Sequence, residues 1–383
     1  MIQTRIKLFF RVYILCYVLS KYSLFCFSQN TKSYIQNPII SDYTVHDVSI
    51  IQYKNSFYAF ASCVAPRDKN EKINYMSVQI FKSSNMVDWS YYKEAISDKY
   101  KEHIYVSEED KKKNRYQIWA PDNIQYKGKL LLFVAFRSSF DDSKIAVFES
   151  NSIDDEFIFK NIIVSNTQHG EKSYFGTREI IDPCPLVYKN KLFLVFGSFS
   201  RDVQGKELSH RKGIGTYIVP LKYGDKISMN GRPVFISDYY EGVNIQKHGK
   251  YFYLFGTNGF YTNNTYKIDF AKSRKISGPY QNAMGLSIAD TVEIHQGTPI
   301  LQTQDTKLRF NGFGCMSNII VDKRGRNFVL VHGHDLDKQP IQMKTSQRER
   351  YAFLIEILWD KQGNPYFDMD AIQKNKIRTP EFN

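Results

Sequence analysis

One short sequence pattern occurs five times along this chain of 383 residues. Each copy has an apolar run, a turn that contains Lys and Asn or Gly, and a second run rich in aromatic residues. The copies read VHDVSIIQYKNSFYAFAS from Val45, WAPDNIQYKGKLLLFVAF from Trp119, IDPCPLVYKNKLFLVFGS from Ile181, YEGVNIQKHGKYFYLFGT from Tyr240 and MSNIIVDKRGRNFVLVHG from Met316. Such turns between β-branched and aromatic runs predict β-hairpins. The nearly continuous apolar runs predict inner strands that are buried on both faces.

The spacing of the turns predicts the architecture. The turn residues lie 59 to 76 residues apart, at Asn55, Gly128, Asn190, Gly249 and Gly325, so each unit has room for two more strands. Candidates for these outer strands are Ser77–Lys82, Trp89–Glu94, Lys144–Ser150, Phe157–Val164 and Thr265–Lys272. Four strands per repeat, without a convincing amphipathic helix, predict an all-β fold: a five-bladed β-propeller with four antiparallel strands per blade. Tandem β-sandwiches would also be all-β, but they would not repeat one hairpin at this period.

The N-terminus has the pattern of a targeting segment. Residues 1–28 begin with Arg5 and Lys7, continue through the short apolar run Val12 to Leu19, and contain no acid. This run is too short to span a bilayer, which needs about 20 residues. We expect a secretory signal cleaved after Ser28, and therefore a secreted, periplasmic or cell-surface protein without a stable membrane span. Lipidation of Cys26, or a retained anchor, is the alternative.

The remaining chain is expected to hold one domain, residues 37–368, followed by a basic tail, 369–383. The net charge of +13 includes four positive charges in the signal. Lys-rich stretches such as Lys99–Arg115 and Gln373–Arg378 are more often solvated loops and tails than binding sites. The run at Lys111 to Lys113 lacks the interleaved aromatic residues of a single-strand groove, so no nucleic-acid partner is expected.

Three cysteines remain after removal of the signal, namely Cys63, Cys184 and Cys315. An odd number cannot pair completely within one chain, and no CxxC motif occurs. We therefore expect buried free thiols rather than a disulfide framework or a zinc site.

Acidic residues occupy one register of the repeat. The positions seven or eight residues before each turn are Asp47, Ala120, Asp182, Glu241 and Ser317. Because inner strands of a propeller begin at the same end of the channel, these side chains are expected to converge on one pocket. A pair of carboxyl groups is the equipment for glycoside hydrolysis, and a third acid raises the pKa of the donor by like-charge repulsion. A single acid at a strand start is usually a solvated end or a cap.

The chain resembles glycoside hydrolase family 43, the five-bladed propellers that include arabinanases, β-xylosidases, arabinofuranosidases and exo-galactanases. The resemblance covers Asn37 to Phe367, and six motifs follow the order of the family. They are Val45-His46-Asp47, Lys82-Ser83-Ser84 with Val87-Asp88-Trp89, Trp119-Ala120-Pro121-Asp122, Ile181-Asp182-Pro183, Tyr240-Glu241-Gly242, and Arg350 through Trp359-Asp360 to Gly363-Asn364-Pro365. The resemblance implies an inverting glycosidase in which Asp47 is the general base, Asp182 the pKa modulator and Glu241 the general acid.

Three further residues are expected at the substrate site. Trp119 would form an apolar wall for a sugar ring, His46 would position the base region, and His332 would face the channel; ordinary structural roles are the alternative for Trp119 and His332. Many family members carry a Gly-His segment at the fifth blade that can hold a metal, where this chain has Met316 beside Cys315. We therefore expect no metal and no cofactor, and a calcium ion on the channel axis is the weaker alternative.

The predicted function is that of a secreted, monomeric glycoside hydrolase acting on polysaccharides or oligosaccharides that contain arabinose, xylose or galactose. A non-catalytic carbohydrate-binding propeller is one alternative. A retaining fructan-type glycosidase is another, although no Asn-Asp-Pro-Asn-Gly-like segment occurs in the first blade. Four polar insertions are expected to rim the pocket: Arg67–Asn74, Lys99–Tyr116, Ser165–Arg178 and Ser200–Arg211.

Overall fold

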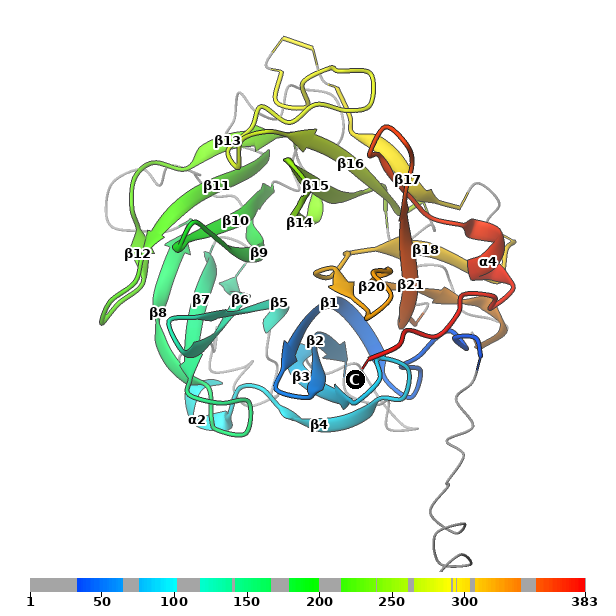
Figure 1. Ribbon diagram of the computed structural model, residues 1–383. Helices are drawn as coiled ribbons and strands as arrows, with labels where there is room; N and C mark the ends of the chain where they lie inside the picture. Colours follow the sequence, from blue (N-terminus) through cyan, green and yellow to red (C-terminus); the bar gives the residue numbers. More distant parts are fainter. Residues whose placement is uncertain are drawn as a thin grey trace, which may run out of the picture. The chain divides into compact units, whose positions relative to one another are not determined.

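Five antiparallel sheets follow one another around a ring in the chain's larger unit, residues 35–383 (Figure 1). The computed structural model describes residues 33–64, 76–101, 118–139, 142–166, 179–199, 215–238, 240–260, 265–290, 292–293, 295–303, 307–338 and 349–382. Residues 1–34 form a separate unit. The predicted signal, most of the four predicted rim loops and part of the Lys99–Arg115 stretch lie outside the described residues. No helix of the described part is both long and apolar enough to cross a bilayer.

The first two blades have four strands each. Blade 1 contains β1 (Thr44–Tyr53), β2 (Ser56–Val64), β3 (Met76–Ser83) and β4 (Ser90–Glu94). Blade 2 contains β5 (Ile118–Tyr126), β6 (Lys129–Ser139), β7 (Asp142–Ser150) and β8 (Ile158–Ser165). Their hairpins and outer strands confirm the predicted ones.

Blades 3 and 4 keep this order. Blade 3 contains β9 (Glu179–Tyr188), β10 (Lys191–Phe199), β11 (Gly215–Lys222) and β12 (Ser228–Met229), and β13 (Val234–Ser237) also pairs with β11. Blade 4 contains β14 (Glu241–His248), β15 (Tyr251–Asn258), β16 (Lys267–Ser273) and β17 (Thr298–Gln302).

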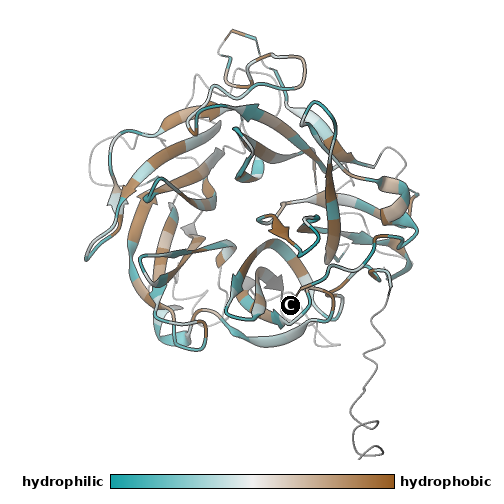
Figure 2. Cartoon of the chain, in the orientation of Figure 1, coloured by the Kyte–Doolittle hydropathy of each residue, from teal (hydrophilic) through white to brown (hydrophobic). Residues whose placement is uncertain are grey.

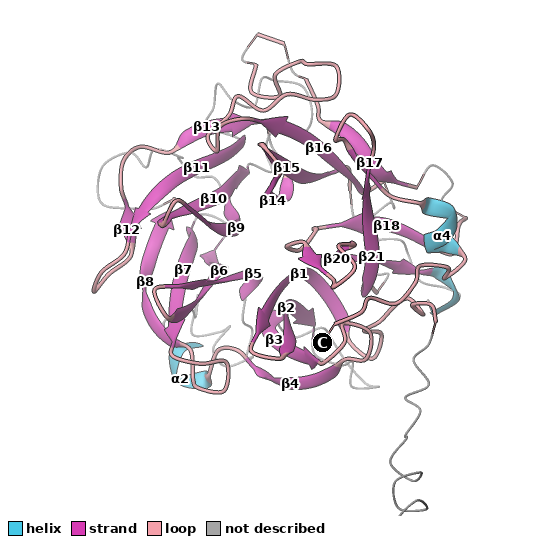
Figure 3. Ribbon diagram, viewed as in Figure 1, coloured by secondary structure: helices cyan, strands magenta, loops and turns pink. Residues whose placement is uncertain are grey.

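Blade 5 differs at its inner edge. Two short strands, β18 (Phe310–Gly314) and β19 (Ile320–Val321), both pair with β20 (Asn327–Asp335), and β21 (Tyr351–Trp359) and β22 (Pro365–Tyr366) follow. The helical segments are short: α2 (Asp98–Lys101), η2 (Leu336–Lys338) and α4 (Met369–Gln373). Figure 3 shows how few they are beside the strands. The all-β, five-bladed propeller prediction is confirmed.

Residues near the start of the larger unit close the ring against blade 5. The backbone N–H of Ile39 donates to the carbonyl of Ala352 in β21 at 2.8 Å. The buried Asn37 amide donates to the Leu354 carbonyl and accepts the Leu354 N–H, both at 2.9 Å. The last blade is thereby joined to the chain that leads into the first.

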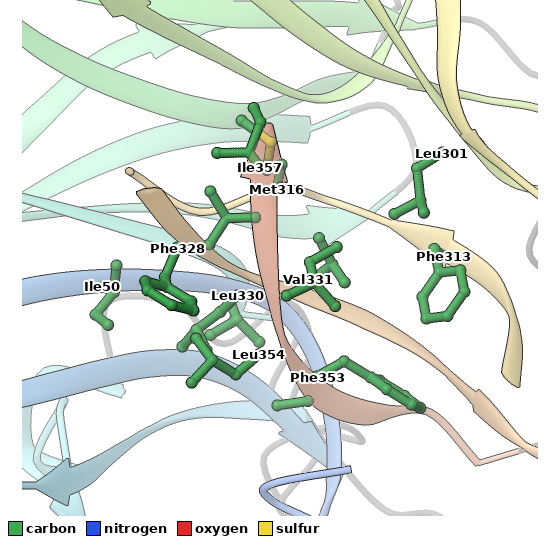
Figure 4. Close-up of a cluster of buried hydrophobic side chains, with 14 of the residues drawn as sticks. Ile50, Leu301, Phe313, Met316, Phe328, Leu330, Val331, Phe353, Leu354 and Ile357 are labelled. Carbon is green, nitrogen blue, oxygen red and sulfur yellow. The ribbon is translucent and has the colours of Figure 1, made fainter. Parts of the chain in front are cut away.

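The core lies between neighbouring blades. Apolar residues run along the strands, while turns and loops are mostly hydrophilic (Figure 2). The largest cluster packs blade 5 against its neighbours, and Figure 4 shows Ile50, Leu330 and Phe353 among its members. Residues beyond 368, expected to form a basic tail, contribute the buried Ile372 and Ile377 to this cluster, because α4 and the segment after it present apolar side chains to blade 5. Cys184 and Cys315 are buried free thiols, as predicted; the side chain of Cys63 lies outside the described part.

Candidate active site

A pocket opens where the inner strands of all five blades begin. Its lining comes from matching short segments: Asp47, Val48 and Ser49; Ala120, Pro121 and Asp122; Asp182 and Pro183; Gly242, Val243 and Asn244; and Cys315, Met316 and Ser317. The predicted convergence of the inner strands on one pocket is therefore observed, and it brings Asp47 and Asp182 together.

One residue at the inner edge of each blade adopts a left-handed backbone conformation. These residues are Asp47, Ala120, Asp182, Gly242 and Cys315, with φ between 48° and 54°. In blades 1 to 4 the residue lies at a shift in the pairing of the inner strand with its neighbour, which is a β-bulge. The bulge turns the carboxyl groups of Asp47 and Asp182 towards the pocket instead of into the sheet.

The structure corrects the register obtained by counting from the turns. Gly242, and not Glu241, is equivalent to Asp47 and Asp182, so Glu241 lies one residue earlier, at the level of His46. In blade 5 the equivalent residue is Cys315 rather than Ser317. Counting fails there because the inner edge is interrupted between β18 and β19. Glu241 is nevertheless close enough for its charge to act on Asp182.

The backbone N–H groups of these left-handed residues are bound by side chains of the preceding blade. The Asp47 N–H donates to His332 Nδ1 at 3.1 Å, the Ala120 N–H to Ser62 Oγ at 2.7 Å, and the Cys315 N–H to Thr257 Oγ1 at 2.8 Å. Ser62, Thr257 and His332 occupy equivalent positions on the second strands, opposite His46, Glu241 and Gly314. Buried N–H groups need such acceptors, so these side chains hold the bulges in place.

Blade 3 uses a different acceptor. Its equivalent position is Gly197, which has no side chain and pairs with Ile181. The Gly242 N–H instead donates to Oδ2 of Asp182 at 2.8 Å. Because Gly197 offers no acceptor, the Gly242 N–H binds the Asp182 carboxyl. This hydrogen bond fixes the position of the Asp182 Oδ2 atom.

Asp47 is held at both its carboxylate and its backbone. Ser62 Oγ donates to Asp47 Oδ2 at 3.0 Å, and the Cys315 thiol also hydrogen-bonds to the Asp47 carboxylate. Burial raises the pKa of the Cys315 thiol well above its usual value, and the charges of Asp47, Asp182 and Glu241 add to the effect. The thiol therefore stays protonated and acts as a donor.

The Asp182 carboxyl keeps its proton to higher pH than an ordinary aspartate. Its pKa is raised first by the surrounding pocket wall, although part of the side chain is open to the pocket, and then by the charges of Asp47 and Glu241. The hydrogen bond from the Gly242 N–H opposes this shift. Three carboxyl groups that interact in this way retain a proton at a pH where separate carboxyls have lost theirs.

Two predicted substrate-binding residues are buried behind Asp47. Arg350 lies between them, with its guanidinium 2.8 Å from His46 Nδ1 and 3.4 Å from His332 Nε2. Burial and the Arg350 charge lower the pKa of both imidazoles, which are therefore neutral. His332 is 0% exposed, which leaves no surface for a sugar. Both imidazoles therefore pack behind Asp47, and a role of His46 at the substrate site stays a prediction. Trp119 is partly exposed and adjoins Ala120.

The sequence analysis assigned no role to a third acid of the pocket lining, which is buried. Asp122 follows Ala120 by two residues, is 6% exposed, and accepts the Asn123 N–H at 2.7 Å and a hydrogen bond from the Cys184 thiol. Burial raises its pKa to about 7. It also missed Ser62 and Thr257, although a signal exists: each is a polar residue seven or eight positions after its turn, in an otherwise apolar strand.

The residues near the base do not fit calcium. Within the described part of the chain, Asp47, Cys315 and His332 place potential ligand atoms within 4.8 Å of one another. Calcium prefers six to eight oxygen ligands, whereas this set offers a thiol and an imidazole. Asp47, Cys315 and His332 therefore do not form an oxygen-rich calcium site.

The family model of glycosyl hydrolases family 43 matches residues 35–365. The chain belongs to this family. Among similar proteins, an extracellular endo-α-(1→5)-L-arabinanase of Bacillus subtilis (strain 168) is 27% identical over 296 residues, which is 74% of this chain and 59% of the relative. The chain therefore spans about three fifths of the length of that relative.

Solved structures of the family show the same fold. The α-L-arabinanase of Cellvibrio cellulosa, complexed with arabinohexaose, superposes with a TM-score of 0.65 at 18% identity, covering 89% of this chain and all of that one. The xylan β-1,4-xylosidase of Bacillus halodurans C-125 gives a TM-score of 0.63 at 16% identity, covering 87% of this chain and 56% of that one. Family membership and the propeller fold agree with the resemblance drawn from the motifs.

Proposed function

We propose that this family 43 protein hydrolyses O-glycosidic bonds of arabinose- or xylose-containing polysaccharides with inversion of the anomeric carbon, using Asp47, Asp182 and Glu241. The observation that carries the proposal is the interaction of three carboxyl groups. Asp47 and Asp182 line the pocket, Glu241 directly precedes the lining residue Gly242, and burial together with the charges of Asp47 and Glu241 raises the pKa of Asp182. Inverting hydrolysis needs one carboxylate that activates water and one carboxylic acid that protonates the leaving oxygen.

Asp47 has the surroundings of a general base. Hydrogen bonds from Ser62 and Cys315 orient its carboxylate, and its neighbours His46 and His332 are neutral. The carboxylate removes a proton from water while that water attacks the anomeric carbon from the face opposite the leaving group.

Glu241 is proposed as the general acid and Asp182 as its modulator. Burial and then the charges of Asp47 and Glu241 raise the pKa of Asp182, and like-charge repulsion between neighbouring carboxyl groups favours retention of a proton by the pair. Glu241 donates this proton to the glycosidic oxygen as the bond breaks. The Gly242 N–H holds Asp182 in place beside Glu241.

Arabinan is the first substrate to test, because the Bacillus subtilis relative is named as an endo-α-(1→5)-L-arabinanase. A panel of aryl α-L-arabinofuranoside, β-xyloside and β-galactoside, together with linear α-1,5-arabinan, identifies the sugar. The sizes of the products released from linear arabinan then distinguish cleavage inside the polymer from cleavage at its ends.

The test of the catalytic roles uses Asp47→Asn and Glu241→Gln, with Glu293→Gln as a matched control on a 76% exposed side chain. Each active-site variant is expected to lower kcat/KM on arabinan at least about 1000-fold, while circular dichroism and Tm stay unchanged. On an aryl glycoside with a strongly acidic phenol, Glu241→Gln should recover much of its rate, because that leaving group needs no proton. Asp47→Asn should not recover its rate on that substrate, because attack by water still needs the base. Full activity of either variant on arabinan contradicts the assignment.

A carbohydrate-binding propeller without catalysis is the second candidate from the sequence. Binding of arabino-oligosaccharides by the wild-type protein, with no turnover on any substrate of the panel, would support it over hydrolysis. The interaction of Asp47, Asp182 and Glu241 favours hydrolysis.

We also propose that residues 1–28 direct secretion and that the mature protein is a monomer. The extracellular relative supports the first part. Expression of the full chain should give a protein in the medium that begins at Gln29, as read by mass spectrometry, and light scattering should give the mass of one chain. A protein that keeps its first 28 residues contradicts the cleavage.

A further inference from the structure

The far ends of the five inner strands carry a ring of cations that the proposed reaction does not use. Each inner hairpin turns through residues 54–55, 127–128, 189–190, 249–250 or 323–325. These turns contain no acid, and their basic residues are all exposed: Lys54, Lys127, Lys189, Lys250, Lys323 and Arg324. We call these six residues the turn ring.

The turn ring lies on the face opposite the pocket. Asp47 and Lys54 are near opposite ends of β1, and seven residues of a strand span roughly 20 Å. The same separation applies in each blade, since all five inner strands run in parallel from the pocket to the turns. The fivefold repeat of the fold therefore gathers at least one cation per blade around the far end of the channel.

Aromatic rings support four of these lysines. The Nζ atoms of Lys54, Lys127, Lys189 and Lys250 lie 5.4 to 5.6 Å from the ring centroids of an adjacent tyrosine. The tyrosines are Tyr53, Tyr126, Tyr188 and Tyr251, all half-buried. Cation–π contacts of this kind hold the ammonium groups near the surface of the blade.

Additional cations strengthen the ring at blade 4. Lys272 Nζ and the Arg274 guanidinium lie 5.5 and 5.7 Å from the Tyr251 ring. Together with Lys250 they lower the pKa of Tyr251, to which the Arg274 hydrogen bond contributes most. The charges of Lys250, Arg274 and Lys272 add to this effect, which agrees with the cluster of cations seen around the ring.

Acids near the turn ring neutralise it mainly at blade 5. Asp322 is buried and binds Arg326 at 2.7 Å, and Glu381 binds Arg324 at 2.6 Å. Asp360 lies near Lys272. Glu156, on the connection between the outer strands of blade 2, pairs with Lys99. The lysines of blades 1 to 4 therefore present a positive surface around the channel.

We propose that the turn ring binds an acidic polysaccharide, a polymer whose sugars carry carboxylates, and so holds the enzyme on its matrix while the pocket on the other face stays free. Cations repeated around a ring match carboxylates repeated along a chain, and lysines suit point contacts with single carboxylates. The tyrosines lie under lysines and are half-buried, so they offer no open platforms for the stacked bases of a single-stranded nucleic acid. The choice of a polysaccharide partner rests on the proposed function.

The test uses polygalacturonate as the probe and the full chain with Glu241→Gln, so that no hydrolysis changes the ligand. One variant replaces Lys54, Lys127, Lys189 and Lys250 by Gln. The matched control replaces four exposed lysines outside the ring, Lys307, Lys338, Lys374 and Lys376, so the net charge is the same. Affinity is measured by electrophoresis through gels that contain the polymer and by titration at 50 and 200 mM salt.

The ring variant is expected to lose at least about tenfold in affinity and most of the salt dependence, while the control stays within about twofold of the parent. Equal losses in the two variants would overturn the proposal, because they would reflect net charge alone. Tighter binding of double-stranded DNA or of anionic vesicles than of polygalacturonate would also overturn it.

A separate readout distinguishes this proposal from the proposed function. The four ring substitutions, placed in the wild-type chain, should leave hydrolysis of an aryl arabinofuranoside unchanged. If no substrate is hydrolysed by the wild type but polygalacturonate binding still requires the ring, only the proposed function fails.

Discussion

Asp47 is fixed by side chains from blades 1 and 5. Ser62 binds its carboxylate and, through the same oxygen, the Ala120 N–H of blade 2. His332 binds its backbone N–H. The orientation of the proposed base therefore depends on residues that do not touch the substrate.

Replacing Ser62 by Ala should lower kcat roughly ten- to a hundredfold with little change in KM, because Asp47 loses one of its orienting hydrogen bonds while the pocket keeps its shape. Steady-state kinetics on an aryl glycoside measure the effect. The loss of an acceptor for the Ala120 N–H should also cost about 1–3 kcal/mol of the free energy of unfolding.

Thr257→Val is the matched control, since Thr257 occupies the equivalent position in blade 4 and accepts the Cys315 N–H. It should cost a similar free energy of unfolding with a smaller effect on kcat. If the two variants lose the same kcat, Ser62 has only a structural role.

Asp122 makes stability depend on pH. Its pKa rises from 3.8 to about 7 in the folded protein because of burial, so the folded state binds more protons than the unfolded state between these values. Burial of Asp122 therefore costs least below pH 4, where the carboxyl is protonated in both states. The free energy of unfolding falls as the pH rises towards 7, by up to about 4 kcal/mol. Asp122→Asn should remove this part of the slope in urea unfolding between pH 4.5 and 7.5. Equal slopes for both proteins would contradict the burial of an ionisable carboxyl there.

At the scale of elements, the ring depends on the pairing of residues near its start with β21. Asn37 is central to this pairing. Its side chain makes the two hydrogen bonds, to the N–H and the carbonyl of Leu354, that a neighbouring strand would otherwise make. This closure joins the two ends of the propeller without a strand shared between blades.

Asn37→Ala should lower the free energy of unfolding by about 2–4 kcal/mol, because both Leu354 groups then remain buried without partners. Thermal and urea unfolding measure the loss. Asn151→Ala, at an exposed position between β7 and β8, should change it by less than about 0.5 kcal/mol. Comparable effects of the two substitutions would show that the Asn37 hydrogen bonds contribute little to the free energy of unfolding.

For the whole molecule, the repeated hairpin made the fold predictable. The turns from Asn55 to Gly325 each join an inner strand to an aromatic second strand, and local sequence alone specifies such a unit. The convergence of Asp47 and Asp182 followed from the same repeat, since equivalent positions of inner strands meet at the channel.

Other features depend on contacts between distant parts of the chain and were not predictable by counting. The bulges changed the register of Glu241 by one residue, and the interrupted edge of blade 5 put Cys315 in place of Ser317. The burial of His332 behind Asp47 arises from the meeting of blades 5 and 1, which are 285 residues apart at this contact. Periodicity describes each blade but not the junction between two blades.

Asp47 is proposed to activate a water on one face of the sugar, while Glu241 protonates the leaving oxygen on the other face. The most direct measurement is proton NMR of the first-formed anomer during hydrolysis of an aryl α-L-arabinofuranoside or β-xyloside, followed from the first minutes before mutarotation. The inverted anomer is expected first: β from the arabinofuranoside or α from the xyloside. Initial release of the retained anomer would contradict it and would favour a covalent glycosyl-enzyme on the same propeller.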